Sequence, residues 1–145
     1  MKASVLKSRW FAAASAAALT AVGMTGIRVL AAEEPKPVGA RQVFSEILPN
    51  VPGKRLTLVQ VTYQPGAKSG SHAHAGSVYA YVLSGKIRSE VSTLGPAKVY
   101  SAGEGFFEAP GSVHRVSENA SDTEPASLLA IFVADDGTEL TRPAQ

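Results

Sequence analysis

The strongest constraint on the fold is a series of short β-forming runs, separated by glycine and proline, that begins near residue 42. Residues 55–64 (RLTLVQVTYQ) alternate between two sets of side chains, and residues 127–134 (SLLAIFVA) form a nearly continuous apolar run typical of a buried strand. No segment after the first 31 residues repeats its apolar side chains with a helical period. Short runs with turns at intervals of about ten residues predict an all-β sandwich or barrel.

The expected strands are residues 42–48, 55–64, 77–83, 86–93, 99–100, 106–108, 112–117 and 127–134. Residues 33–40 are polar and contain two prolines, so we expect an extended lead-in there. Residues 135–145 are expected to form a polar tail.

The first 31 residues predict a secretory signal peptide. Lys2, Lys7 and Arg9 precede an uncharged, alanine-rich stretch at residues 10–26, and small residues follow it. Cleavage near residue 31 would leave a single domain at residues 32–145, exported to the periplasm or secreted, with no stable membrane span. Arg28 is close to that cleavage position, so an uncleaved anchor is the alternative, although the uncharged run is short for a membrane-spanning helix.

Composition then excludes several classes of function. Residues 32–145 carry 10 basic and 12 acidic side chains, whereas a nucleic-acid-binding surface needs clustered positive charge. The chain has no cysteine, which excludes disulfides, thiolate metal ligands and a cysteine nucleophile.

All three histidines of the chain lie in two compact, glycine-rich segments. His72 and His74 lie in residues 66–85 (GAKSGSHAHAGSVYAYVLSG), and His114 lies in residues 103–119 (GEGFFEAPGSVHRVSEN). On a strand, residues i and i+2 point to the same face, so the first two imidazoles can face one metal ion. His114 could complete the set from a neighbouring strand.

These two segments resemble the two signature motifs of the cupin superfamily. The first motif is matched by Gly66, His72, His74 and Gly85. The second motif is matched more loosely, with one additional residue before the proline and one after the histidine, by Gly103, Pro110, Gly111, His114 and Asn119. The resemblance implies a small, single-domain jelly roll, or double-stranded β-helix barrel, with a metal inside. The implied metal ligands are His72, His74 and His114.

One position departs from the family pattern. The glutamate of the first cupin motif falls on Val78, which cannot bind a metal. The three remaining histidines resemble the ligand set of three-histidine cupin dioxygenases, which implies one divalent ion. Fe(II) is favoured, and Mn, Cu, Zn and Ni are alternatives. A site without that carboxylate favours an anionic, chelating small-molecule substrate.

Glu108 is the candidate replacement carboxylate and the candidate catalytic residue. It lies six residues before His114, after two phenylalanines and before an Ala-Pro-Gly turn. Direct metal binding, orientation of an imidazole and action as a base on substrate are three roles that the sequence leaves open.

Two further expectations concern the strand faces. If Val78 occupies the inward position of the family glutamate, Ala80 and Val82 face inward with it. Tyr79 and Tyr81 are then expected to pack between the sheets or at an oligomer contact. Residues 106 and 107, both phenylalanine, are expected in the core.

Three functions remain open at this stage. The first is a metal-dependent dioxygenase acting on a small chelating substrate. The second is a non-enzymatic module that binds a ligand or a metal, and the third is a metal-independent isomerase. Members of the family are often dimers, which makes a homodimer a further expectation.

Overall fold

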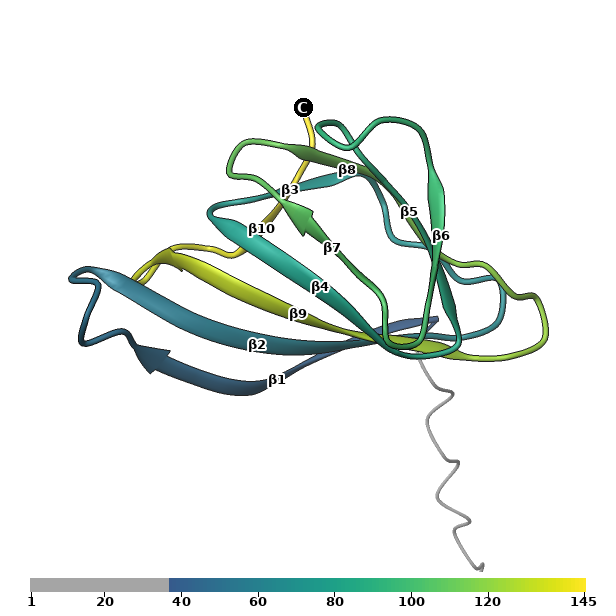
Figure 1. The fold of residues 1–145 in the computed structure, drawn as a ribbon, viewed down its shortest axis with the longest axis horizontal. Helices are drawn as coiled ribbons and strands as arrows, with labels where there is room; N and C mark the ends of the chain where they lie inside the picture. Colours follow the sequence, from purple (N-terminus) through teal and green to yellow (C-terminus); the bar gives the residue numbers. More distant parts are fainter. Residues whose placement is uncertain (1–36) are drawn as a thin grey trace, which may run out of the picture. The chain divides into compact units, whose positions relative to one another are not determined.

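A computed structural model describes residues 37–145, so the predicted signal peptide lies outside the described residues. The described part is all-β, as the sequence predicted, and contains ten strands (Figure 1). They are β1 (Val38–Ile47), β2 (Lys54–Tyr63), β3 (His72–His74), β4 (Ser77–Ser84), β5 (Lys86–Val91), β6 (Lys98–Ser101), β7 (Gly105–Glu108), β8 (Val113–Asn119), β9 (Ala126–Asp135) and β10 (Thr141–Pro143). Within residues 37–145 no helix could cross a membrane.

The strands form two five-stranded sheets that face each other. One has the order β1-β2-β9-β4-β7 and the other the order β10-β3-β8-β5-β6. Every pairing is antiparallel, and Figure 1 shows β2 and β9 on the opposite side of the fold from β3, β8 and β5. This arrangement is the jelly roll that the sequence predicted.

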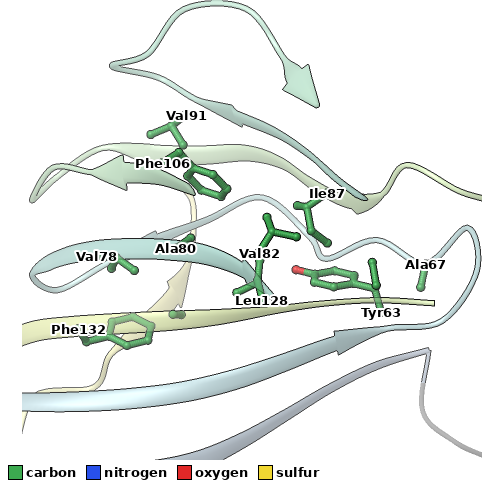
Figure 2. Close-up of a cluster of buried hydrophobic side chains, with 12 residues drawn as sticks. Tyr63, Ala67, Val78, Ala80, Val82, Ile87, Val91, Phe106, Leu128 and Phe132 are labelled. Carbon is green, nitrogen blue, oxygen red and sulfur yellow. The ribbon is translucent and has the colours of Figure 1, made fainter. Parts of the chain in front are cut away.

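The space between the sheets is filled from inward-facing positions of both (Figure 2). On β4, Val78, Ala80 and Val82 are buried, as alternation predicted. Tyr79 and Tyr81 are 44% and 39% exposed on the outer face of the sheet, so the expectation of packing between the sheets was wrong, and an oligomer contact stays a prediction.

The two phenylalanines of β7 also divide between the faces. Phe106 is 4% exposed and belongs to the core, whereas Phe107 is 47% exposed. Consecutive residues of a strand point to opposite faces, so the expectation that both lie in the core was wrong.

Two pairings extend the expected strands. β1 begins at Val38, four residues before the expected start, because it pairs with the whole length of β2. The expected polar tail contains β10, which pairs with β3. All three residues of β10 are exposed, so no apolar alternation in the sequence indicated a strand.

Gly85 turns the chain between β4 and β5. Its φ of +68° is in the region that favours glycine, and an added Cβ would lie 2.6 Å from the carbonyl oxygen of Pro125. This glycine closes the first histidine segment. Only glycine fits here, both in backbone conformation and in close packing, where the chain leaves β4 of one sheet and enters β5 of the other.

A β-bulge in β8 determines which of its side chains face the interior. Val116 pairs with Glu90 and His114 pairs with Val91, which leaves Arg115 as an additional residue without a paired partner. A single additional residue inverts the alternation that follows it. As a result, His114 before the bulge and Ser117 and Asn119 after it are all buried.

Candidate metal centre

The three histidines meet between two neighbouring strands. His72 and His74 lie on β3, and His72 is in direct register with His114 of β8. The ring centroid of His72 lies 4.9 Å from that of His74 and 4.9 Å from that of His114. One nitrogen from each ring lies within 4.8 Å of the other two. The structure thus brings together the three residues that the sequence selected.

Backbone carbonyls orient two of the rings. His72 donates from Nδ1 to the carbonyl oxygen of Gly70 at 2.7 Å, and His74 donates from Nδ1 to that of Leu140 at 3.1 Å. Thr141 Oγ1 lies a further 3.1 Å from His74 Nδ1. A nitrogen that donates cannot also offer a lone pair, so Nε2 of each ring is left free. Histidine ligands in metalloproteins are held in this way.

Ser89 of β5 orients the third ring. Its hydroxyl lies 2.8 Å from Nε2 of His114, and both residues are buried. When His114 donates from Nε2 to Ser89 Oγ, its Nδ1 carries the lone pair and points toward Glu108. Ser89 is on the inward-facing side of β5, as alternation along that strand indicates, but no sequence motif marks it as part of a site.

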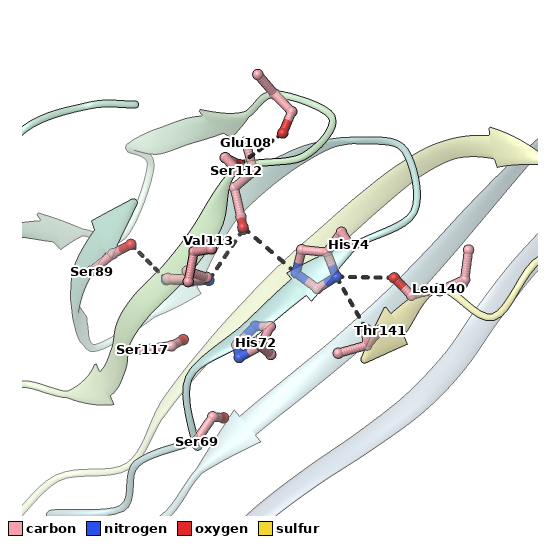
Figure 3. Close-up of polar contacts among 12 residues, drawn as sticks. Ser69, His72, His74, Ser89, Glu108, Ser112, Val113, Ser117, Leu140 and Thr141 are labelled. Atoms are coloured by element: carbon pink, nitrogen blue, oxygen red, sulfur yellow. Dashed lines mark hydrogen bonds and ion pairs between the residues drawn. The ribbon is translucent and has the colours of Figure 1, made fainter. Parts of the chain in front are cut away.

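Glu108 lies beside the histidines and is 3% exposed. Its Oε1 is 3.3 Å from His114 Nδ1, and its Oε2 is 3.6 Å from His74 Nε2 (Figure 3). Oε2 is buried and has no hydrogen-bond partner within residues 37–145. An ionised carboxylate in this position needs a nearby positive charge.

The register of the sheet explains how Glu108 can stand in for the family glutamate. Val78, at the position of that glutamate, pairs directly with Glu108 across β4 and β7. Side chains of paired residues lie on the same face, so the carboxylate is displaced by one strand and still faces the interior.

This donor set fits a divalent metal ion. Three imidazole lone pairs and one buried carboxylate oxygen without a partner converge on one region. Imidazole suits Zn, Cu, Fe and Ni, and carboxylate oxygen suits Mn. A cation there would neutralise the buried carboxylate, so the residues themselves are consistent with an ion.

Burial keeps two of the histidines in the form that binds metal. Desolvation lowers the pKa of His72 and of His74 below the ordinary value of 6.5. Glu108 opposes the shift of both pKa values, but desolvation is the larger influence. Both rings are therefore neutral near pH 7.

The histidines open onto a cavity of about 530 Å³. Its wall is mainly apolar and includes Val59, Val61, Leu128 and Phe132. Its polar lining includes, besides the histidines and Glu108, the hydroxyl-bearing Tyr63, Ser69 and Ser117 and the cationic Arg142. A small apolar cavity with a few convergent polar groups is typical of a site for a small molecule.

Asn119, which the second motif includes, has a structural role. Its Nδ2 donates to the carbonyls of Gln64 at 3.1 Å and Glu124 at 2.7 Å, and its Oδ1 accepts from the amide of Ser121. The bulge at Arg115 accommodates the additional residue between His114 and Asn119, so Asn119 still faces inward.

The comparison with protein families agrees with this geometry. The family model described as a cupin domain matches residues 59–132, which is just over half of the chain. The chain belongs to the cupin family. That match includes all three histidines and Glu108.

Solved structures agree with the observed fold. A protein from Klebsiella pneumoniae with a double-stranded β-helix domain is 20% identical, with a TM-score of 0.59, covering 79% of this chain and 90% of that chain. The DMSP lyase of Ruegeria pomeroyi is 15% identical, with a TM-score of 0.58, covering 74% of this chain and 52% of that chain. No curated protein matches the sequence.

Oxalate decarboxylase from Bacillus subtilis, a protein with Mn(II) centres, is more similar in sequence. It is 30% identical with a TM-score of 0.51, and the match covers 61% of this chain. The match spans 23% of that enzyme, so its activity is not transferred to this shorter chain.

Proposed function

We propose that this cupin binds one divalent metal ion through His72, His74 and His114 and acts on a small oxygen-bearing substrate in the adjoining cavity. One observation carries the proposal. Three oriented imidazole nitrogens lie within 4.8 Å of one another, beside a buried carboxylate oxygen without a hydrogen-bond partner.

The chain's own residues would contribute orientation, exclusion of water and a proton acceptor. Gly70, Leu140 and Ser89 hold the three rings, so little reorganisation would accompany metal binding. The apolar wall strengthens electrostatic interactions inside the cavity. Glu108 could bind the ion directly or accept a proton from substrate, since its Oε2 is free of other partners.

The reaction that we favour is oxidation of a chelating substrate by dioxygen with Fe(II), and Mn is the main alternative. A bound ion would supply Lewis acidity and, for iron, redox chemistry. The neutral three-histidine set supports this choice, because it does not cancel the charge of the ion. With Glu108 ionised, a divalent ion and Arg142, which also lines the cavity, leave a net charge of about +2, which favours an anionic substrate.

Metal content tests the binding step. Protein purified without chelators or nickel affinity should contain one equivalent of metal by mass spectrometry, whereas His72→Ala and His114→Ala should contain almost none. His72 is partly exposed, so His72→Ala should fold and separates ligand loss from unfolding. Absence of metal after anaerobic loading would refute the proposal.

Oxygen uptake tests the reaction. A panel of β-diketones, thiol acids and dihydroxyaromatic compounds is added to the iron-loaded protein in an oxygen electrode. Uptake that is lost in His74→Ala would support the dioxygenase. Metal binding without uptake would favour a non-enzymatic binding module, and turnover that survives a chelator would favour an isomerase.

We also propose that the protein is exported after cleavage near residue 31. The charged start and alanine-rich stretch of residues 1–31 support this proposal. Mass spectrometry of protein from fractionated cells tests it. An intact residue 1 in the cytoplasmic fraction would contradict it.

A further inference from the structure

A second group of polar side chains lines the cavity away from the histidines. Tyr63 at the end of β2, Ser69 in the loop before β3, and Ser117 in β8 all contact the cavity. Tyr63 and Ser117 are 3% and 4% exposed, and Ser69 is half-buried. We call these three residues the hydroxyl cluster.

The hydroxyl cluster has one more donor than its internal hydrogen bonds use. Tyr63 Oη lies 2.7 Å from Ser117 Oγ and 3.1 Å from Ser69 Oγ, and these are the hydrogen bonds of the three hydroxyls within residues 37–145. Three hydroxyls carry three protons, and two hydrogen bonds use two of them. One proton therefore remains for a partner, and the cluster borders the cavity.

A hydrogen-bond acceptor in the cavity would satisfy this proton. Buried donors without partners are costly, and the neighbouring wall, which includes Val59, Val61 and Leu128, is apolar. We propose that the hydroxyl cluster is a second binding subsite, which accepts a carbonyl or carboxylate oxygen of the substrate while a different oxygen of that substrate faces the histidines.

The spacing of the two subsites defines a class of substrate. Ser117 follows His114 by three residues in β8, but because of the bulge at Arg115 they pair with Ser89 and Val91, which are only two residues apart in β5, so their backbone positions are roughly 7 Å apart at about 3.3 Å per residue. A ligand that reaches both subsites must therefore carry two separate oxygen functions, so the structure assigns small acids with a second oxygen function along the chain, such as 4- and 5-oxo acids.

Matched pairs of acids test this subsite. Mn(II)-loaded protein is titrated by calorimetry with 4-oxopentanoate against pentanoate, and with 5-oxohexanoate against hexanoate. We expect at least one oxo acid to bind about 3- to 10-fold more tightly than its parent, the value of one hydrogen bond. Each single hydroxyl deletion would still leave an unused proton, so all three are removed together: Tyr63→Phe/Ser69→Ala/Ser117→Ala should abolish the preference and leave affinity for the parent acid within about twofold.

Tyr81→Phe is the matched control, because it also removes a tyrosine hydroxyl but lies on the exposed outer face. It should keep the full preference. The inference is overturned if wild type shows no preference for either oxo acid, or if the preference survives in the triple variant.

This inference rests on the proposed metal-binding function, and the experiment separates the two failures. Metal content is measured on every sample before titration. If the protein binds no Mn(II), the same pairs are titrated into metal-free protein. A preference that is lost in the triple variant would then support the hydroxyl cluster and contradict only the metal proposal, whereas its absence in wild type would overturn the subsite.

Discussion

The two faces of the β1-β2-β9-β4-β7 sheet differ in burial and in polarity, although neighbouring residues of the same strands build them. One inward row crosses all five strands in register: Ser45, Thr57, Phe132, Val78 and Glu108. The adjacent outward row also crosses all five strands: Phe44, Leu58, Ile131, Tyr79 and Phe107.

The inward row is buried except for the half-buried Ser45, and it ends at a carboxylate. The outward row is apolar, with Phe44, Tyr79 and Phe107 exposed and the other two residues half-buried. Glu108 is 3% exposed, while its neighbour Phe107 is 47% exposed. Apolarity therefore does not identify the interior of this sheet. The inner face is instead marked by a buried polar residue, Glu108, which lies beside the histidines.

The largest expected effect is the difference in stability between removing a phenylalanine from the inner face and removing one from the outer face. Phe132→Ala should lower the free energy of unfolding by about 3–5 kcal/mol, because a buried phenylalanine leaves a cavity. The ring also packs edge-on against His74, with centroids 5.1 Å apart. Phe107→Ala should cost about 1 kcal/mol or less. Urea unfolding of both variants checks the difference, and equal losses would contradict the assignment of the two faces.

The next effect concerns the charge at the end of the inward row. Glu108→Gln should weaken metal binding by about 10- to 100-fold, since the amide cannot neutralise the ion. Without metal, the same variant should be at least as stable as wild type, because it removes a buried charge. Metal titration and unfolding of the metal-free protein measure the two quantities. Unchanged metal affinity would exclude Glu108 from the centre.

A carboxylate swap sharpens the comparison between β4 and β7. Glu108→Val should lose most of the metal affinity, and the double variant Val78→Glu/Glu108→Val should recover part of it, at least about threefold. The physical reason is that residues 78 and 108 are paired in register and face the same interior. A double variant no better than Glu108→Val would show that the two positions are not equivalent toward the ion.

The smallest effect is a dependence of stability on pH in the metal-free protein. The lowered pKa values of His72 and His74 mean that the unfolded chain binds more protons than the native one just below pH 6.5. Stability is thus fully present above pH 6.5 and falls as pH decreases toward the native pKa values. Urea midpoints from pH 7.5 to 5 measure this, and His74→Gln should reduce the slope.

Sequence reasoning predicted the parts of this molecule that depend on local pattern. The strands at β2, β4 and β9 followed from alternation and apolar runs, and the histidine spacing selected the metal-centre residues. Glu108 was selected from its position relative to His114. Its pairing with Val78, however, depends on which strands become neighbours in the sheet, and no local pattern in a single sequence predicts that order.

The missed parts all depend on contacts between distant segments. β10 contains no apolar alternation, yet Leu140 and Thr141 at its start hold His74, which lies 66 and 67 residues earlier. The hydroxyl cluster joins Tyr63 to Ser117, 54 residues apart. Tyrosine and serine are common, so neither contact leaves a recognisable signal in the sequence.

The bulge at Arg115 has a consequence for how this segment can vary in evolution. Arg115 is exposed, so its side chain is free to change, but its presence as a residue is not. Deleting it would invert the phase of the strand that follows and turn Ser117 and Asn119 out of the interior. In related sequences, residue 115 should therefore accept any substitution that keeps a strand. Insertions and deletions at this position should be absent, so the identity of the residue can vary while the length of the segment is conserved.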